Sequence, residues 1–343
     1  MDRDKLDWSC LSKYRNSIYG VSIILVILFH FLDRVRHLNG VFSEIARLYW
    51  ILIGSVGVDI FLIMSGMSLF YSMKKDPNVF DFYKKRCKRI IIPYLSIGFI
   101  FWYMKDIAVR QLGIKALLKD LFFVTFFTDG DRSLWFIIAI FIIYMIYPLL
   151  FKIYDKIDKC NGILTMVLIG FIVGLNYLMY LNNTELYDNI EIMLTRFPAI
   201  VLGTYCGKKA YKKEPIRKLD IGIIGTSICI DLAIGFYRIL KVGYIEGKVL
   251  RYDQIARGIV VIFLIVLLFS KIKSKRVGEL TSIVGNYSLE LYLIHVSIFE
   301  LFDEFGVQTT KVICFLIIII ITAELAQGFR RICDRIYKFF ERT

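Results

Sequence analysis

The sequence lacks the features that mark most soluble and metal-binding proteins. Its seven cysteines are odd in number, scattered along the chain, and show no CxxC spacing, so we interpret them as reduced thiols outside any metal site. No stretch between the apolar segments is long enough to hold a soluble core. The opening run MDRDKLDWSCLSKYR is polar, and no small-residue cleavage site follows the first apolar run. We therefore expect no cleavable signal peptide and a first span that stays in the mature chain.

Long apolar runs dominate what is present. The 343 residues are 57% hydrophobic, with a mean hydropathy of +0.61. Apolar runs of membrane-spanning length recur from Ile18 to Ala326, a pattern that soluble cores do not produce. The net charge of +14 comes largely from short basic loops between these runs, which membrane topology explains better than nucleic-acid binding. The sequence thus predicts a membrane-embedded protein with lipid around it and no nucleic-acid partner.

The apolar runs predict an all-α polytopic bundle of about ten transmembrane helices. We expect these spans at residues 18–33, 47–73, 90–105, 133–151, 162–181, 190–207, 219–237, 254–270, 283–302 and 310–329. An eleventh apolar segment, residues 111–127, contains lysines and suits an interfacial helix better. The expected organisation is a cytoplasmic segment at 1–17, a transmembrane domain at 18–329 and a basic cytoplasmic tail at 330–343.

Basic residues set the expected orientation, because basic loops are retained in the cytoplasm. Lysine and arginine are concentrated in residues 74–89, 208–218, 271–276 and 330–342, whereas residues 182–189 contain neither. With an even number of spans, both termini lie in the cytoplasm. The sequence therefore predicts a multi-pass protein of the cell membrane.

Two histidines stand inside the apolar runs at similar depths. His30 and His295 each lie twelve residues into an outward-running span, about 18 Å from the cytoplasmic side of a core about 30 Å thick. Asp59 falls near the same level, about 16 Å from the outer side. Ionisable residues within spans usually face a bundle interior or a wet cavity. We therefore expect these side chains to meet in a polar chamber open to the outside.

Further polar residues are expected around this chamber. Arg196 and Arg257 lie near the outer ends of their spans, and Asp231 and Glu290 lie near the midplane. Ser288, Tyr292 and His295 are spaced i, i+4 and i+7, so they share one helix face, whereas Glu290 lies on another.

Each of these residues also has a purely structural interpretation. A single intramembrane histidine often only hydrogen-bonds between helices, and the acidic side chains can serve the same purpose. Arg257 can extend to the interface, and the cluster FYKKRCKR can be a signal for topology and anionic lipid. Two histidines at matched depth beside a carboxylate favour chemistry.

Several segments resemble the acyltransferase-3 family of integral-membrane O-acyltransferases. GVSIILVILFHF resembles the family's opening segment with its histidine, His30, and GVDIFLIMSGMSLF is similar to its Gly-x-Asp-x-Phe-x-x-x-Ser-Gly pattern. That pattern is matched by Gly57, Asp59, Phe61, Ser65 and Gly66. FYKKRCKRIIIPY resembles the family's Arg-x-x-Arg segment, through Arg86, Arg89 and Pro93. Similarity to later family blocks is carried by Trp135, Phe136, Tyr144, Pro148, Arg196, Gly203, Tyr292 and His295.

The chain departs from the family pattern at three points. Tyr19 stands where many members have an arginine, with Arg15 one turn earlier. Ile140 and Phe141 stand where some members have carboxylates, so no acid is assigned there. The esterase-like domain fused to some members is absent, so the acyl group would pass directly to the acceptor or to a separate protein.

The resemblance implies transfer of an acyl group, usually acetyl from acetyl-CoA, to a hydroxyl of an extracytoplasmic carbohydrate or glycolipid, without a metal. The catalytic candidates are His30, as general base or transient acyl carrier, Asp59, to orient an imidazole or stabilise its cation, and His295, to position substrate and stabilise oxyanion charge. Guanidinium groups pair well with phosphate, so Arg86 and Arg89 are the candidates for binding acyl-CoA. The candidates for substrate binding are Tyr292, Arg196, Ser65, Trp135 and Glu290.

Two other classes of function are compatible with intramembrane charges. A transporter or flippase for a glycan or lipid intermediate would line a pathway with them, but the sequence shows no internal repeat and no paired Gly/Pro-broken spans. A sensor or assembly scaffold would need no histidine pair.

Overall fold

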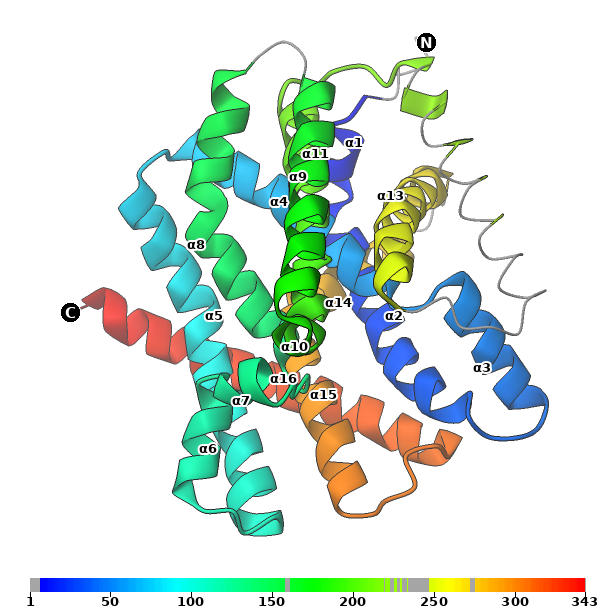
Figure 1. Ribbon diagram of the computed structural model, residues 1–343, viewed down its shortest axis with the longest axis vertical. Coiled ribbons are helices and arrows are strands. Elements are labelled where there is room, and N and C mark those ends of the chain that lie inside the picture. The colour runs from blue at the N-terminus through cyan, green and yellow to red at the C-terminus, as the bar shows by residue number, and fades with distance from the viewer. Residues whose placement is uncertain are drawn as a thin grey trace.

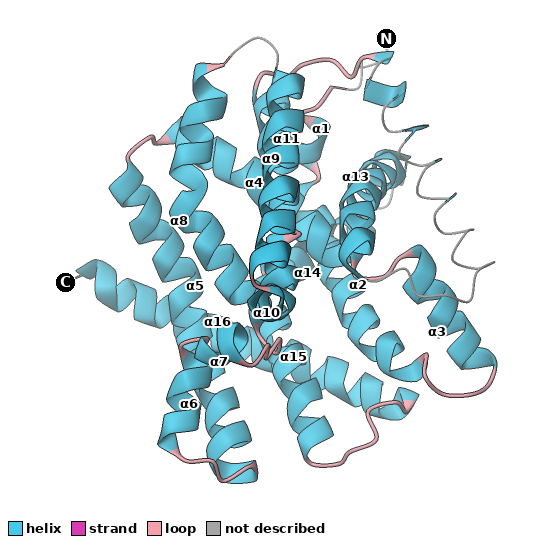
Figure 2. Cartoon of the chain, in the orientation of Figure 1, coloured by secondary structure: helices cyan, strands magenta, loops and turns pink. Residues whose placement is uncertain are grey.

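The computed structural model describes residues 7–157, 161–218, 247–271 and 275–342, together with a few positions between 219 and 246. The described part is almost entirely helical and contains no strand, as the sequence predicts (Figure 2). Among the described residues, seven helical stretches are long and apolar enough to cross a membrane: Arg15–Val35, Val41–Lys75, Val79–Val109, Trp135–Lys156, Asn161–Asn182, Arg251–Lys271 and Val312–Tyr337. Most of the predicted seventh span, residues 219–237, lies outside the described residues.

The helices pack together in a bundle (Figure 1). Their bounds are α1 Cys10–Lys13, α2 Arg15–Val35, α3 Val41–Leu52, α4 Val56–Lys75, α5 Val79–Trp102, the π-helix η1 Tyr103–Val109, α6 Ile114–Leu121, α7 Val124–Thr128, α8 Trp135–Lys156, α9 Asn161–Asn182, α10 Thr184–Leu194, α11 Phe197–Tyr211, α13 Gly247–Lys271, α14 Lys275–Asn286, α15 Ser288–Glu304 and α16 Val312–Arg342. The expected basic tail is therefore the helical end of α16.

Helix α4 forms the centre of the bundle, packed against α2, α11 and α13 (Figure 1). Its glycines let neighbouring backbones approach closely, as small residues do between membrane helices. A Cβ at Gly57 would lie 2.7 Å from the carbonyl oxygen of Ser22 on α2. A Cβ at Gly203 on α11 would lie 2.8 Å from the carbonyl carbon of Ile63. Glycine at these positions therefore fixes α4 between α2 and α11.

Three of the predicted spans are broken in the structure. Residues 47–73 belong to α3 and α4, which separate at residues 53–55. Residues 190–207 belong to α10 and α11, which separate at Thr195 and Arg196 because Pro198 favours a new helix start at that point. Residues 283–302 belong to α14 and α15, which separate at Tyr287. Apolar content alone does not reveal such breaks. Side chains at these breaks line the two cavities described below, among them Arg196 and the residues of the first turns of α15.

Candidate functional site

The two intramembrane histidines lie against each other. His30, on α2, and His295, on α15, have ring centroids 5.2 Å apart at an interplanar angle of 63°. The rings of Phe29 and Phe299 lie 5.8 Å and 6.5 Å from the ring of His30. The imidazoles therefore share an aromatic environment.

The hydrogen bonding of His295 defines its tautomer. Its Nδ1 lies 2.7 Å from the carbonyl oxygen of Leu291. A carbonyl oxygen only accepts, so Nδ1 donates its proton and Nε2 of the neutral ring holds a lone pair. Nε2 is buried and has no hydrogen-bond partner among the described residues. His295 thus keeps one unprotonated ring nitrogen in the interior without a hydrogen-bond partner among the described residues.

An ion pair beside the histidines joins the same two helices. Arg34 donates to a carboxylate oxygen of Asp303 over 2.6 Å, and its guanidinium lies 4.6 Å from the centroid of the Phe299 ring. Arg34 also donates to the carbonyl oxygen of His30 over 2.9 Å. These contacts hold α2 against α15 at the level of the imidazoles.

His30 opens into a cavity of about 730 Å³, which we call the histidine cavity. Its wall combines indole rings with side chains of both charges. The main residues are Val26, His30, Arg34, Trp50, Ser55, Val58, Lys105, Asp131, Ser133, Trp135, Arg196, Glu300 and Asp303. Of the residues predicted to bind substrate, Trp135 and Arg196 lie in this wall.

Asp59 is buried beside Arg196 rather than bonded to an imidazole. Nε of Arg196 lies 3.6 Å from Oδ1 of Asp59, and neither oxygen of Asp59 accepts a hydrogen bond from a described residue. Arg196 also donates to Ser55 over 2.9 Å and lies 5.0 Å from the ring centroid of Trp135. Asp59 therefore pairs with Arg196 at the cavity wall, and its expected action on an imidazole stays a prediction. Arg257, expected at the cavity mouth, donates instead to Asp253 over 3.0 Å.

A buried lysine in the histidine cavity was not selected from the sequence. Lys105 lies on η1 with 3% of its side chain exposed, and donates to Ser133 over 3.0 Å and to Asp131 over 3.3 Å. Its Nζ lies 3.9 Å from a carboxylate oxygen of Glu300. Burial opposes ionisation of Asp131, but the ammonium of Lys105 and hydrogen bonds from Ser133 outweigh it and lower the pKa of the carboxyl. The sequence signal that could have identified Lys105 is a lysine at the end of an apolar run.

A second cavity, of about 1240 Å³, holds the candidate acyl-CoA residues, and we call it the basic cavity. Seven cationic side chains line it: Arg15, Lys75, Lys85, Arg86, Lys88, Arg89 and Arg330. Nε of Arg86 is buried and donates to no described residue. The guanidinium of Arg86 lies over the neighbouring rings of Phe82 and Tyr144, 5.6 Å and 5.8 Å from their centroids. These two rings hold the guanidinium in place, and its Nε donates to no described residue.

The remaining predicted substrate residues line the basic cavity and not the histidine cavity. Ser65, Tyr292 and Glu290 all contribute to its wall. Glu290 is 2% exposed and accepts from Arg330 of α16 over 2.9 Å, an ion pair that was not expected because Arg330 was assigned to the tail. The single chamber expected from the sequence is thus two chambers, with Arg15 and Tyr19 both in the basic one. Asp231 lies outside the described residues.

The fold and the two cavities define a multi-helix membrane protein with a buried histidine pair, one member of which lines a chamber, and a cationic chamber beside it. Residues 18–325 match the acyltransferase-3 family model, which is described as an acyltransferase domain. The match covers most of the chain, so the protein belongs to the acyltransferase-3 family and is, in general terms, a membrane acyltransferase. No curated protein and no solved structure matches the chain.

Proposed function

We propose that the protein transfers an acyl group, acetyl being the expected one, from cytoplasmic acyl-CoA to a hydroxyl group of an extracytoplasmic carbohydrate or cell-envelope glycan. The observation that carries this proposal is the end-to-end placement of the two cavities along α2 and α4. On α2, Arg15 and Tyr19 line the basic cavity and His30 and Arg34 line the histidine cavity. One protein thus presents a site for an anionic donor and a site for a general base along the same helices.

The basic cavity suits the phosphates of coenzyme A. Guanidinium groups form strong paired hydrogen bonds to phosphate oxygens, and Arg86 has a buried, unused donor. Lys75, at the end of α4, and Tyr211, at the end of α11, also line this cavity. These helix ends adjoin the basic loops expected in the cytoplasm, which supports a donor site that opens to the cytoplasm.

The histidine cavity suits a carbohydrate acceptor. Trp50 and Trp135 offer flat apolar surfaces to a sugar ring, and Asp131, Glu300 and Arg196 offer acceptors and donors to its hydroxyl groups. A sugar bound there would have a hydroxyl within reach of His30.

The chemistry follows from these positions. His30 removes the proton of the acceptor hydroxyl, whose oxygen attacks the thioester carbonyl carbon; the carbon–sulfur bond breaks, and the CoA thiolate leaves and regains a proton. In a two-step form, an imidazole nitrogen of His30 carries the acyl group between thiol and hydroxyl. His295 accepts or returns a proton beside it, and Arg196 stabilises the oxyanion that forms at the carbonyl oxygen.

The test uses membranes that contain the protein, incubated with acetyl-CoA labelled in its acetyl group. Label should become covalently attached to envelope glycans, with a mass increase of one acetyl group per modified sugar. His30→Ala should lose this transfer and His37→Ala should retain it, because His37 is exposed and lines neither cavity. Movement of a glycan across the membrane without any change in its mass would identify a transporter instead.

A further inference from the structure

The two cavities meet at two valines. Val26 on α2 and Val58 on α4 are the residues that line both cavities, and both are buried. On α2, Val26 lies seven residues after Tyr19 and four before His30. At the rise of an α-helix, His30 is therefore only about 6 Å along the axis beyond Val26. A thioester that reaches these valines lies close to the histidine pair.

The lining of the basic cavity changes from cationic to apolar along its length. Lys75 and Val58 lie seventeen residues apart on α4, a span of about 25 Å. Cations line the end near Lys75, whereas the end near Val58 is lined by Phe61, Phe136 and Tyr292. This polarity matches acyl-CoA, which has phosphates at one end, an extended arm and an apolar acyl group at the other. The acyl group should therefore lie against the apolar end.

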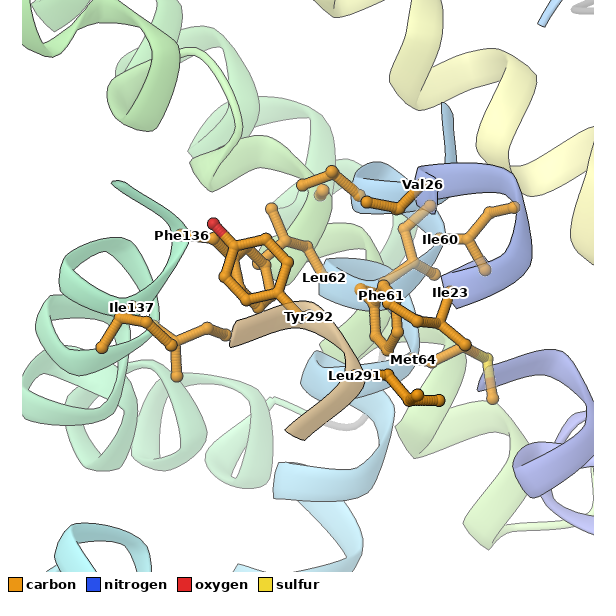
Figure 3. Close-up of a cluster of buried hydrophobic side chains, with 14 of the residues drawn as sticks. Ile23, Val26, Ile60, Phe61, Leu62, Met64, Phe136, Ile137, Leu291 and Tyr292 are labelled. Atoms are coloured by element: carbon orange, nitrogen blue, oxygen red, sulfur yellow. The ribbon is translucent and has the colours of Figure 1, made fainter. Parts of the chain in front are cut away.

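Close packing leaves little free space at that end. The ring of Phe136 lies 6.1 Å from Phe61 and 5.2 Å from Tyr292, and Tyr292 lies 5.8 Å from His295. Figure 3 shows Val26, Phe61, Phe136 and Tyr292 within one cluster of apolar side chains. All are at most 8% exposed. We name Val26, Val58, Phe61, Phe136 and Tyr292 the apolar septum.

We propose that the apolar septum is the acyl-chain subsite and that it restricts the donor to short acyl groups. This inference rests on the proposed function and specifies its donor. Interiors are packed nearly as densely as crystals, so each added methylene has to displace a ring or a valine. Discrimination of about tenfold per methylene is typical of such pockets. Phe136 is a large side chain on α8, away from the close α2–α4 contact.

The test measures equilibrium binding of free CoA and of acetyl-, butyryl- and hexanoyl-CoA to the purified full-length protein in lipid nanodiscs. The wild type should bind free CoA and acetyl-CoA well and should bind the longer thioesters progressively more weakly, by about tenfold for each methylene. Phe136→Ala should bind butyryl-CoA at least about tenfold more tightly than the wild type does, with free CoA unchanged. Val58→Ala, a smaller change, should act in the same direction.

A matched control is Phe171→Ala on α9, where the side chain is 62% exposed and lines neither cavity. It should keep the wild-type preference. Equal binding of all chain lengths by the wild type, or an unchanged preference in both septum variants while free CoA still binds, would overturn the septum proposal alone. Failure of the wild type to bind free CoA at all would overturn the proposed function.

Discussion

The rings of His30 and His295 lie 5.2 Å apart although 265 positions separate them in the chain. The ion pair between Arg34 and Asp303 keeps α2 against α15 beside them. His30 borders the histidine cavity, whereas Nε2 of His295 is buried. In the proposed mechanism, the two rings therefore act as one unit on a substrate that only His30 touches.

Replacing either histidine should remove most of the activity. We expect His30→Ala and His295→Ala each to lower the transfer rate by about 10²–10⁴-fold, since each removes a positioned acid–base group. The double variant should be little worse than either single one, because residues that act as a unit are not additive. Transfer assays on membranes with equal amounts of protein measure this. If the losses of the two single variants multiplied in the double variant, the two histidines would have independent roles.

Replacing both cavity arginines should weaken donor binding. Arg86→Ala combined with Arg89→Ala should raise the Kd for acetyl-CoA by about 100-fold, because two charge-assisted hydrogen-bond donors are lost. Lys84→Ala is the matched control, since Lys84 is exposed and lines neither cavity. Titration calorimetry measures the Kd values. Unchanged affinity in the double variant would assign these arginines to membrane topology.

Neutralising Asp59 should destabilise the protein. Asp59→Asn leaves the guanidinium of Arg196 buried with a weaker partner, at a cost of about 3 kcal/mol. A lower Tm in detergent measures the effect. Adding Arg196→Met should recover stability but not transfer, because Arg196 also lines the histidine cavity. Recovery of both stability and transfer would show that Arg196 has no part in catalysis.

A methyl group at the α4–α11 contact should also destabilise the bundle. Gly203→Ala would place a Cβ 2.8 Å from the carbonyl carbon of Ile63 and force the helices apart, at a cost of about 1–3 kcal/mol. Gly170→Ala on α9 meets no atom within 4 Å and should be neutral or stabilising. Thermal unfolding measures the Tm of both variants. Equal Tm values would show that the α4–α11 contact tolerates the added methyl group.

The contribution of the Asp131 carboxyl to stability should be lost only in acid. Its pKa is lowered, so the charged form is favoured in the fold. The stabilisation is complete above the ordinary aspartate pKa of about 3.9 and is lost as the pH falls through the lowered value. The Tm difference between the wild type and Asp131→Asn should therefore be constant from about pH 5 to 8 and shrink below about pH 4. A difference that changed near neutral pH would contradict this.

Much of the fold follows from the sequence because apolar length is a direct physical requirement of the bilayer. The helical class and the paired depth of His30 and His295 rest on that requirement and on the helical rise. The motif from Gly57 to Gly66 is explained by contacts, since Gly57 and Gly66 pack α4 against its neighbours while Asp59 meets Arg196.

The division into two cavities could not be read from the sequence. It depends on which apolar side chains turn inward at one level, and Val26 and Val58 look like any other valines in an apolar run. Lys105 and Arg330 were missed for a different reason. Both stand at the edges of spans, where a cation ordinarily extends to the interface, and only the fold shows that they turn toward Asp131 and Glu290.

The apolar septum also has a consequence for the energetics of the whole cell. If the two cavities opened to opposite sides of the membrane and joined through water, protons would leak along the connection and dissipate the proton gradient. A narrow, dry constriction of valines and aromatic rings resists hydration and blocks ion passage. In the proposed function, an acyl group that crosses at Val26 and Val58 would therefore move from one aqueous compartment toward the other while the membrane stays electrically sealed.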